Sequence, residues 1–393
     1  MRAKPRIAVV TPFFPTKEEP FRGHSAYQCL RRMTDDAEIE VFCPLAAYPN
    51  TSWLTPRSYR YHRASLDYSP PDLKAHYFEY PALPLVTRPI NWALCLRRLL
   101  PLLRQFQPDL LLNYWLYPEG YAAIRAGKRL GIPVIVRSIG SDIRRIPDSP
   151  TRYFTRRTLQ EASLVITAST ELRQRAIELG ASPERCQAIL NGCDITTFHP
   201  MDRLQARHDL GLEENAEIVV YVGSLLASKG LLDLFQAVER LAAQRPRLKV
   251  YCIGNGPLEP ELRSLADSKR LSGQFQLPGK RTSQEVAQWM AAADVFCLPS
   301  HSEGCPNVVI EAIACGRPVV GTDVGGIPEL VDSESGILTP AHAPDQLATA
   351  LDQALRQSWD ASIISHKYLR SWEQVAREMM AACSTVLISC GPE

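Results

Sequence analysis

Short apolar runs and amphipathic stretches alternate along the whole chain. β-Rich apolar runs predict strands at residues 6–12, 39–44, 108–113, 133–138 and 163–169 in the first half, and at 217–223, 248–254, 275–279, 294–300 and 317–323 in the second. Between them lie helical patterns, such as residues 231–244, where apolar side chains recur at helical spacing. Continuous apolar strands that alternate with helices predict parallel sheets covered on both faces.

The alternation restarts at Glu217, after a turn-rich segment at residues 191–203. A chain of 393 residues is also too long for one ordinary core. We therefore predict two doubly wound α/β domains, residues 1–198 and 199–365, with a last helix in 366–393 that packs back on the first domain. Open α/β sheets bind ligands beyond the carboxyl ends of their strands, so two such domains facing each other predict a cleft lined by these loops.

Charge divides unevenly between the halves. Residues 1–197 carry 27 Lys+Arg against 18 Asp+Glu, and the remainder carries 17 against 24. The basic half favours an anionic partner, either a membrane surface or a phosphorylated ligand, although uneven solvated faces would give the same split. No run of 18 apolar residues and no signal peptide is evident, and the eleven cysteines show no metal-binding spacing. These features predict a cytoplasmic protein with cysteines in its cores.

One βα loop of the second half has the character of a phosphate site. Lys229 and Gly230 stand between the strand at 217–223 and the helix that follows. A helix N-terminus favours an anion, and the lysine adds a positive charge. A solvated lysine in an ordinary loop remains the alternative for this residue.

Two glutamates flank the start of another predicted helix. Glu303 lies on the loop after the strand at 294–300, and Glu311 lies about one turn inside the apolar helix 307–315, which Pro306 precedes and Gly316 ends. Helical side chains lean toward the N-terminus, which directs the carboxylate of Glu311 to the same cleft. A buried carboxylate needs partners, and the vicinal hydroxyls of a ribose would supply them.

The second half of the chain resembles the family 4 glycosyltransferases, which have the GT-B fold of two facing Rossmann-like domains. The resemblance is carried by the stretches "ILNGCDITTF", "VGSLLASKG" and "SEGCPNVVIEAIACGRPVVGTDVGG". The resemblance covers most of residues 160–340 and is looser in the first half. It implies that Glu303 holds the donor sugar, Glu311 the ribose, and Lys229 the donor diphosphate. It implies a donor site that is completed by Gly23, Gly223, Ser224, Gly304, Cys305, Pro306, Asn307 and Val308. It also places Tyr114 and Asp142 on the acceptor side.

The chain departs from the family pattern at several of these positions. Ser224 stands where many relatives have arginine, Pro306 lacks an N–H group, and Tyr114 and Ile139 stand where many have histidine. No histidine is therefore given a role. No two aspartates are separated by one residue, so we expect no metal and no other cofactor.

The resemblance implies a retaining transferase, with Lys229 and Glu303 as the catalytic pair, that moves a sugar from a nucleotide-diphosphate sugar to a glycan or lipid-linked acceptor. Cell-surface polysaccharide or glycolipid biosynthesis is the expected setting, without nucleic acid. The basic amphipathic stretch at 87–106 predicts either peripheral contact with an anionic membrane or an ordinary helix packed on the sheet, and Pro101 argues against one long helix. A non-catalytic nucleotide-sugar-binding subunit and a nucleotide-sugar epimerase of similar fold remain as alternatives.

Overall fold

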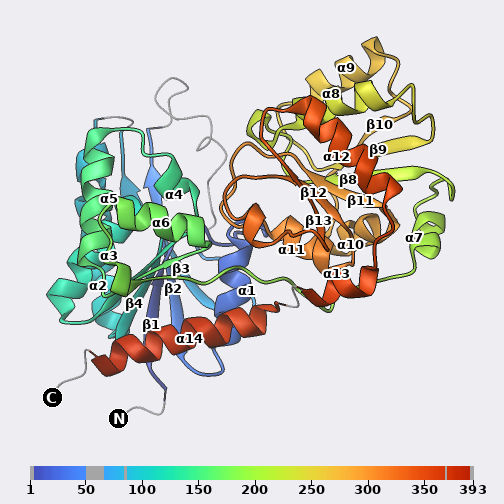
Figure 1. Cartoon of the computed structure of the whole chain (residues 1–393). Helices are drawn as coiled ribbons and strands as arrows, with labels where there is room; N and C mark the ends of the chain where they lie inside the picture. The colour runs from blue at the N-terminus through green and yellow to red at the C-terminus, as the bar shows by residue number, and fades with distance from the viewer. Residues whose placement is uncertain (1–3, 50–65, 84–85, 368–369, 390–393) are drawn as a thin grey trace. The chain divides into compact units, whose positions relative to one another are not determined.

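The computed structural model of the chain describes residues 4–49, 66–83, 86–367 and 370–389 (Figure 1). The chain divides into two compact units, residues 1–191 with 372–393 and residues 192–371. The turn-rich segment at 191–203 thus contains the first boundary, slightly earlier than the predicted 198/199. The segments that enter and leave the second unit run side by side, because the N–H of Cys193 donates to the carbonyl of Arg370 at 2.9 Å.

The described part of the first unit contains a parallel sheet of seven strands in the order β3-β2-β1-β4-β5-β6-β7. Its strands are β1 (Arg6–Val10), β2 (Glu38–Ala47), β3 (Lys74–Pro81), β4 (Leu110–Tyr114), β5 (Val134–Ser138), β6 (Leu164–Thr167) and β7 (Cys186–Ala188). The order reverses between β1 and β4, which are hydrogen-bonded neighbours. In doubly wound sheets ligands bind at the carboxyl ends beside such a reversal.

Helices cover both faces of this sheet. They are α1 (His24–Met33), α2 (Asn91–Phe106), α3 (Tyr121–Leu130), α4 (Ser141–Arg144), α5 (Ser149–Glu161), α6 (Thr170–Glu178) and α14 (Trp372–Ser389), with short helices η2 (Arg88–Ile90), η3 (Leu116–Gly120) and η4 (Pro183–Arg185). Helix α14 packs beside α1 (Figure 1). Both helices contribute fully buried methionines, Met33 and Met379, to the core against β1 and β4. The last helix of the sequence therefore belongs to the core of the first unit.

The second unit repeats the topology. In its described residues a parallel sheet of six strands has the order β10-β9-β8-β11-β12-β13. Its strands are β8 (Glu217–Val222), β9 (Leu248–Ile253), β10 (Phe275–Gly279), β11 (Val295–Leu298), β12 (Val319–Thr322) and β13 (Gly336–Thr339). The helices are α7 (Arg203–Asp209), α8 (Leu231–Leu241), α9 (Glu259–Ser268), α10 (Ser283–Ala292), α11 (Asn307–Ala314), α12 (Pro344–Arg356) and α13 (Ala361–Lys367), with η5 (Ala227–Lys229) and η6 (Ile327–Glu329).

The prediction of two doubly wound parallel sheets is confirmed. The prediction that Pro101 interrupts its helix is wrong, since α2 is continuous from Asn91 to Phe106. The described residues include ten cysteines, all of them buried, and none forms a disulfide. None of the helices in the described ranges is both long enough and apolar enough to cross a membrane.

Candidate functional site

The carboxyl ends of β8 and β11 bring a lysine and a glutamate into direct contact. These strands are neighbours in the second sheet, so the loops that follow them meet. Nζ of Lys229 lies 2.6 Å from Oε1 of Glu303, and the hydroxyl of Ser300 donates to the same oxygen at 2.7 Å. Glu303 is 8 % exposed and Ser300 is fully buried. The sequence thus correctly predicts that Lys229 and Glu303 share one edge of the sheet, but not that they pair.

Two helices begin at this edge without a side chain to cap them. Gly230 starts α8 with a φ of 68°, and a Cβ there would lie 1.8 Å from the carbonyl oxygen of Pro299. Only glycine allows so close an approach of the two loops. Helix α11 begins after Pro306, again without a side-chain cap. The helix dipoles at these two ends, together with the ammonium of Lys229, give an environment suited to an anion.

The remaining loop residues predicted to bind donor lie around these helix ends. Gly223 and Ser224 follow β8, and the carbonyl of Ser224 accepts a 2.9 Å hydrogen bond from the hydroxyl of Tyr221. Gly304, Asn307 and Val308 are partly exposed, whereas Cys305 and Pro306 are buried. Ser224 cannot supply the positive charge of the arginine found in many relatives, so the ammonium of Lys229 is the cation of this loop.

Glu311 lies one turn inside α11, where it is only partly exposed between buried Ile310 and Ala312. Among the described residues no side chain hydrogen-bonds to its carboxylate. Burial raises its pKa from 4.5 to about 7. A carboxylate in this state gains from any ligand that donates hydrogen bonds to it.

His301 lies on the same loop as Glu303, two residues earlier in the chain. Its Nε2 lies 2.8 Å from Oδ2 of Asp233 on α8, and its ring lies against that of His342, with centroids 3.6 Å apart and planes tilted by 35°. Within the described ranges, these three residues form the one group of potential metal ligands, with ligand atoms within 4.8 Å of one another. The direct bond between Asp233 and His301 occupies one oxygen of the carboxylate and one ring nitrogen of the histidine.

In the first unit, Gly23 precedes α1 with a φ of 62°, and a Cβ there would lie 2.1 Å from the carbonyl oxygen of Phe13. The loop after β1 therefore lies against the start of α1, and a side chain would separate them. That Gly23 also allows backbone to come close to a ligand stays a prediction.

The two residues assigned to the acceptor side have different surroundings. Oδ1 of Asp142 accepts hydrogen bonds from the hydroxyl of Ser138 and the N–H groups of Ile139 and Gly140, and its Oδ2 accepts from the N–H of Leu116. Asp142 thus fixes the loops after β4 and β5. Tyr114 is buried in the hydrophobic core of the unit.

A pocket of about 380 Å³ lies at the carboxyl ends of β1 to β5, beside the reversal of strand order, and every residue that lines it belongs to the first unit. Asp142 lines it, and Tyr114 does not. Its most unusual member is Glu119, a residue that is only 4 % exposed. The sequence analysis did not select this residue. A single carboxylate in the aromatic segment "YWLYPEG", directly after a strand, could have indicated a ligand-binding position.

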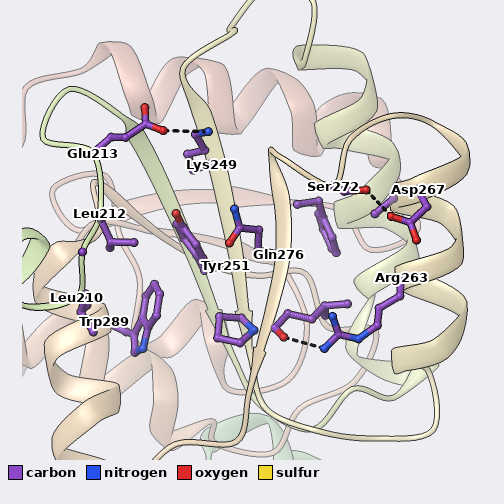
Figure 2. A pocket seen from close by; sticks show the side chains of 15 residues that line it. Leu210, Leu212, Glu213, Lys249, Tyr251, Arg263, Asp267, Ser272, Gln276 and Trp289 are labelled. Atoms are coloured by element: carbon purple, nitrogen blue, oxygen red, sulfur yellow. Dashed lines mark hydrogen bonds and ion pairs between the residues drawn. The ribbon is translucent and has the colours of Figure 1, made fainter.

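A larger pocket of about 620 Å³ lies in the second unit near the amino end of β9 (Figure 2). Figure 2 shows some of its polar side chains paired with one another or with the backbone: Lys249 pairs with Glu213 at 3.3 Å, and Arg263 donates to the carbonyl of Leu277 at 2.9 Å. It shares no residue with the loops of Lys229 and Glu303. The buried indole N–H of Trp289 in this pocket has no hydrogen-bond partner among the described residues. The pocket nevertheless lies away from the strand ends at which such sheets bind ligands.

Comparison with known proteins agrees with the geometry. Residues 24–192 match the model of the glycosyl transferase 4-like domain, and residues 216–357 match that of glycosyl transferases group 1. A D-inositol 3-phosphate glycosyltransferase of Kribbella flavida is 30% identical over 304 residues, 70% of each chain. The chain belongs to the family 4 glycosyltransferases. Another glycosyltransferase of this kind, TuaC of Bacillus subtilis, named for teichuronic acid biosynthesis, is 27% identical over 378 residues, 92% of each chain.

Solved structures place this glycosyltransferase in the GT-B fold. Anabaena HepE, solved in complex with UDP, superposes with a TM-score of 0.73 at 19% identity and covers 97% of this chain and 100% of its own. Sucrose-phosphate synthase of Thermosynechococcus elongatus superposes with a TM-score of 0.74 at 18% identity, covering 98% and 100%. The predicted family and fold are both confirmed.

Proposed function

We propose that this glycosyltransferase moves a sugar from a nucleoside-diphosphate sugar to a glycan or lipid-linked acceptor, with retention at the anomeric carbon and without a metal ion. The observation that carries the proposal is the contact of Lys229 with Glu303 at the carboxyl ends of β8 and β11, beside two uncapped helix N-termini. HepE, the neighbour of the same fold, was solved with UDP.

In this proposal Lys229 acts on the leaving group. As the bond to the anomeric carbon breaks, negative charge grows on the diphosphate, and the ammonium and the helix ends of α8 and α11 stabilise it. This fixed positive charge replaces the one that a metal ion supplies in other transferases. The diphosphate also competes with Glu303 for the ammonium of Lys229.

Glu303 acts on the sugar. Its Oε1 is held by Lys229 and Ser300, whereas Oε2 forms no hydrogen bond with any described residue. When the ammonium of Lys229 pairs with the diphosphate, the carboxylate of Glu303 is released to accept hydrogen bonds from the sugar hydroxyls. Its negative charge also stabilises the positive charge of an oxocarbenium-like transition state. We assign no covalent nucleophile, and the departing phosphate receives the proton of the acceptor hydroxyl.

The acceptor side belongs to the first unit in this proposal. The relatives are named for D-inositol 3-phosphate and for teichuronic acid biosynthesis, which agrees with synthesis of a cell-surface polysaccharide or glycolipid. Such acceptors bring the enzyme to the inner face of the membrane, where we place it as a peripheral protein.

Incubation of the full chain with a panel of nucleoside-diphosphate sugars tests the proposal. We expect release of a nucleoside diphosphate with one of them, faster when acceptor is present and abolished in Lys229→Ala. Arg240→Ala, an exposed cation of the same unit, is the matched control and should behave like wild type. Tight binding of a donor without release would instead indicate a non-catalytic subunit, and conversion of the donor sugar into its epimer would indicate an epimerase.

A further inference from the structure

The pocket of the first unit, here called the N-terminal pocket, has the walls of a sugar site. The rings of Phe13 and Trp115 lie 4.8 Å apart at its edge, and Tyr117 forms another side. Aromatic faces and edges pack well on the apolar face of a sugar ring, and a few polar groups then fix its orientation. Its volume of about 380 Å³ suits one or two sugar units.

Glu119 is a buried carboxyl of this pocket that the protein leaves partly unsatisfied. Its Oε2 is buried and has no hydrogen-bond partner among the described residues. Its Oε1 has one side-chain partner, the hydroxyl of Tyr80, at 3.4 Å. Burial raises the pKa of this carboxyl from 4.5 to about 7. An orphaned buried oxygen has a cost that a hydrogen-bonding ligand would remove.

Three arginines line the same pocket, and they differ in their partners. Arg88 pairs with Asp148 at 2.5 Å, and Arg22 pairs with Glu19 at 3.3 Å. Arg145 is exposed and has no carboxylate partner in the described ranges. The N-terminal pocket therefore offers a cation for which the protein supplies no anion.

We propose that the N-terminal pocket binds the acceptor through an acidic sugar, whose carboxylate or phosphate pairs with Arg145 while Glu119 hydrogen-bonds to the same sugar. This inference rests on the proposed function, because it names the chemical class of the acceptor. Glu119 is then a specificity-determining residue, since its protonated form donates a hydrogen bond to an anion and its ionised form repels one.

The proposal predicts that binding depends on pH. A bound anion stabilises the neutral carboxyl of Glu119 and raises its pKa further, so affinity falls as the pH rises through about 7. The other groups that face Glu119 are Tyr80 of β3, Tyr48 after β2, Tyr117, Cys95 of α2 and Arg88. Burial raises the pKa values of Tyr48, Tyr117 and Cys95, so these groups stay neutral between pH 6 and 8. Asp142 also lines the pocket, and its carboxylate is held by four hydrogen bonds.

Saturation-transfer NMR on the full chain, with methyl glucuronide as the acidic probe and methyl glucoside as its neutral match, tests this directly. We expect the glucuronide to bind more tightly at pH 6, and to lose about fivefold in affinity by pH 8 if the bound anion moves the pKa of Glu119 by about one unit. Glucose 6-phosphate, compared at pH 6 only because phosphate itself titrates nearby, separates a phosphate acceptor from a carboxylate one.

Three variants complete the test. Glu119→Gln keeps the shape and should make glucuronide binding independent of pH, and Arg145→Ala should remove the preference for acidic sugars. Arg129→Ala, an exposed arginine of the same unit that does not line the pocket, should change neither. Equal binding of acidic and neutral sugars, or a pH dependence that persists in Glu119→Gln, overturns the inference.

Failure of this inference can be told apart from failure of the proposed function. Release of nucleoside diphosphate from donor, with no preference for acidic sugars, contradicts only the acceptor class. Selective glucuronide binding without turnover of any donor contradicts the transferase and leaves the pocket assignment intact.

Discussion

At the scale of single residues, Glu311 is the clearest case of a side chain whose position makes sense only with a ligand. It is a carboxylate in an apolar helix, its pKa is about 7, and no described side chain bonds to it. Hydrogen bonds from ribose hydroxyls favour its ionised form, so donor binding should lower this pKa. We therefore expect donor affinity to rise with pH through about 7 in wild type and to stay flat in Glu311→Gln, as measured by calorimetry. Glu311→Ala should weaken binding by about 1.5–3 kcal/mol.

The same carboxyl provides a control in the absence of donor. Its pKa is raised on folding from 4.5 to about 7, so it costs stability as the pH rises from 4.5 through 7. Glu311→Gln removes that cost and should melt higher than wild type at pH 8 and at a similar temperature at pH 4.5. A variant with lower stability at both pH values, together with unchanged donor affinity, would contradict the ligand role.

Lys229 and Glu303 touch in the structure, yet we expect their substitutions to act on different kinetic constants. Lys229 faces charge that grows in the transition state, so Lys229→Ala should lower kcat by about a hundredfold or more. Glu303→Gln keeps the shape of the side chain and removes its charge. A fall in kcat would show that this charge stabilises the cationic sugar, and a change mainly in KM would show that it only holds the donor. Near-normal kcat in Lys229→Ala would overturn the assignment of the phosphate site.

The predicted independence of a metal ion also depends on Lys229. Because the ammonium of Lys229 and two helix ends supply the positive charge, we expect donor turnover to survive treatment with EDTA. The group formed by Asp233, His301 and His342 makes the experiment informative. Loss of turnover that manganese restores in wild type, but not in His342→Ala, would assign a metal to that group and contradict the proposal.

At the scale of secondary structure elements, the start of α8 depends on one glycine. Gly230 has a φ of 68°, and a Cβ would lie 1.8 Å from the carbonyl oxygen of Pro299. Gly211 has nearly the same φ, 66°, with nothing within 4 Å of a Cβ. Gly211→Ala should therefore cost only the conformational penalty of about 1–2 kcal/mol, whereas Gly230→Ala should cost more and displace Lys229. Thermal melting of both variants measures the difference in folding stability. Equal losses of stability would mean that the loop after β11 can move aside for the added Cβ without a further cost.

The elements also show what sequence patterns can and cannot predict. The buried central strands were predictable because both of their faces are apolar. Strands β3, β7 and β13 were missed: β7 and β13 are short edge strands, and β3 alternates exposed and buried positions, so none forms a continuous apolar run. Lys229, Glu303 and Glu311 were predictable because each is a charged residue beside an apolar element. The environment of Glu119 was not, because Tyr80 on the missed strand β3 contributes to it.

Helix α2 shows how the structure decides between two interpretations of one segment. Leu99 and Leu103 are fully buried against the first sheet, so its main apolar stripe is part of the core. The stretch at 87–106 is thus an ordinary packed helix on that face. Arg97, Arg98 and Arg104 point outward from the opposite face and are exposed. Any membrane contact of α2 must therefore be electrostatic rather than insertion of its apolar stripe.

At the scale of the whole molecule, charge separates along the structural division of the chain. The first unit carries 28 Lys+Arg and 20 Asp+Glu, whereas the second carries 16 and 22. The positive sign of the first unit suits its proposed partners, an acidic acceptor and an anionic membrane, whereas the donor diphosphate meets the local positive charge of Lys229 in a unit that is negative overall. An anionic surface attracts basic residues by about 1 kcal/mol for each one near it, within a Debye length.

We therefore expect the chain to float with vesicles that contain phosphatidylserine, to bind neutral vesicles weakly, and to be released by added salt. Reversal of two exposed arginines on α2, Arg97→Glu with Arg98→Glu, should weaken flotation by more than tenfold, because two attractions become two repulsions. The matched control reverses two exposed arginines elsewhere, Arg247→Glu with Arg377→Glu, and changes the net charge by the same amount. If both pairs reduce flotation equally, net charge alone acts and α2 is not the docking face. If the chain binds anionic and neutral vesicles equally, the proposed electrostatic contact with the membrane is wrong.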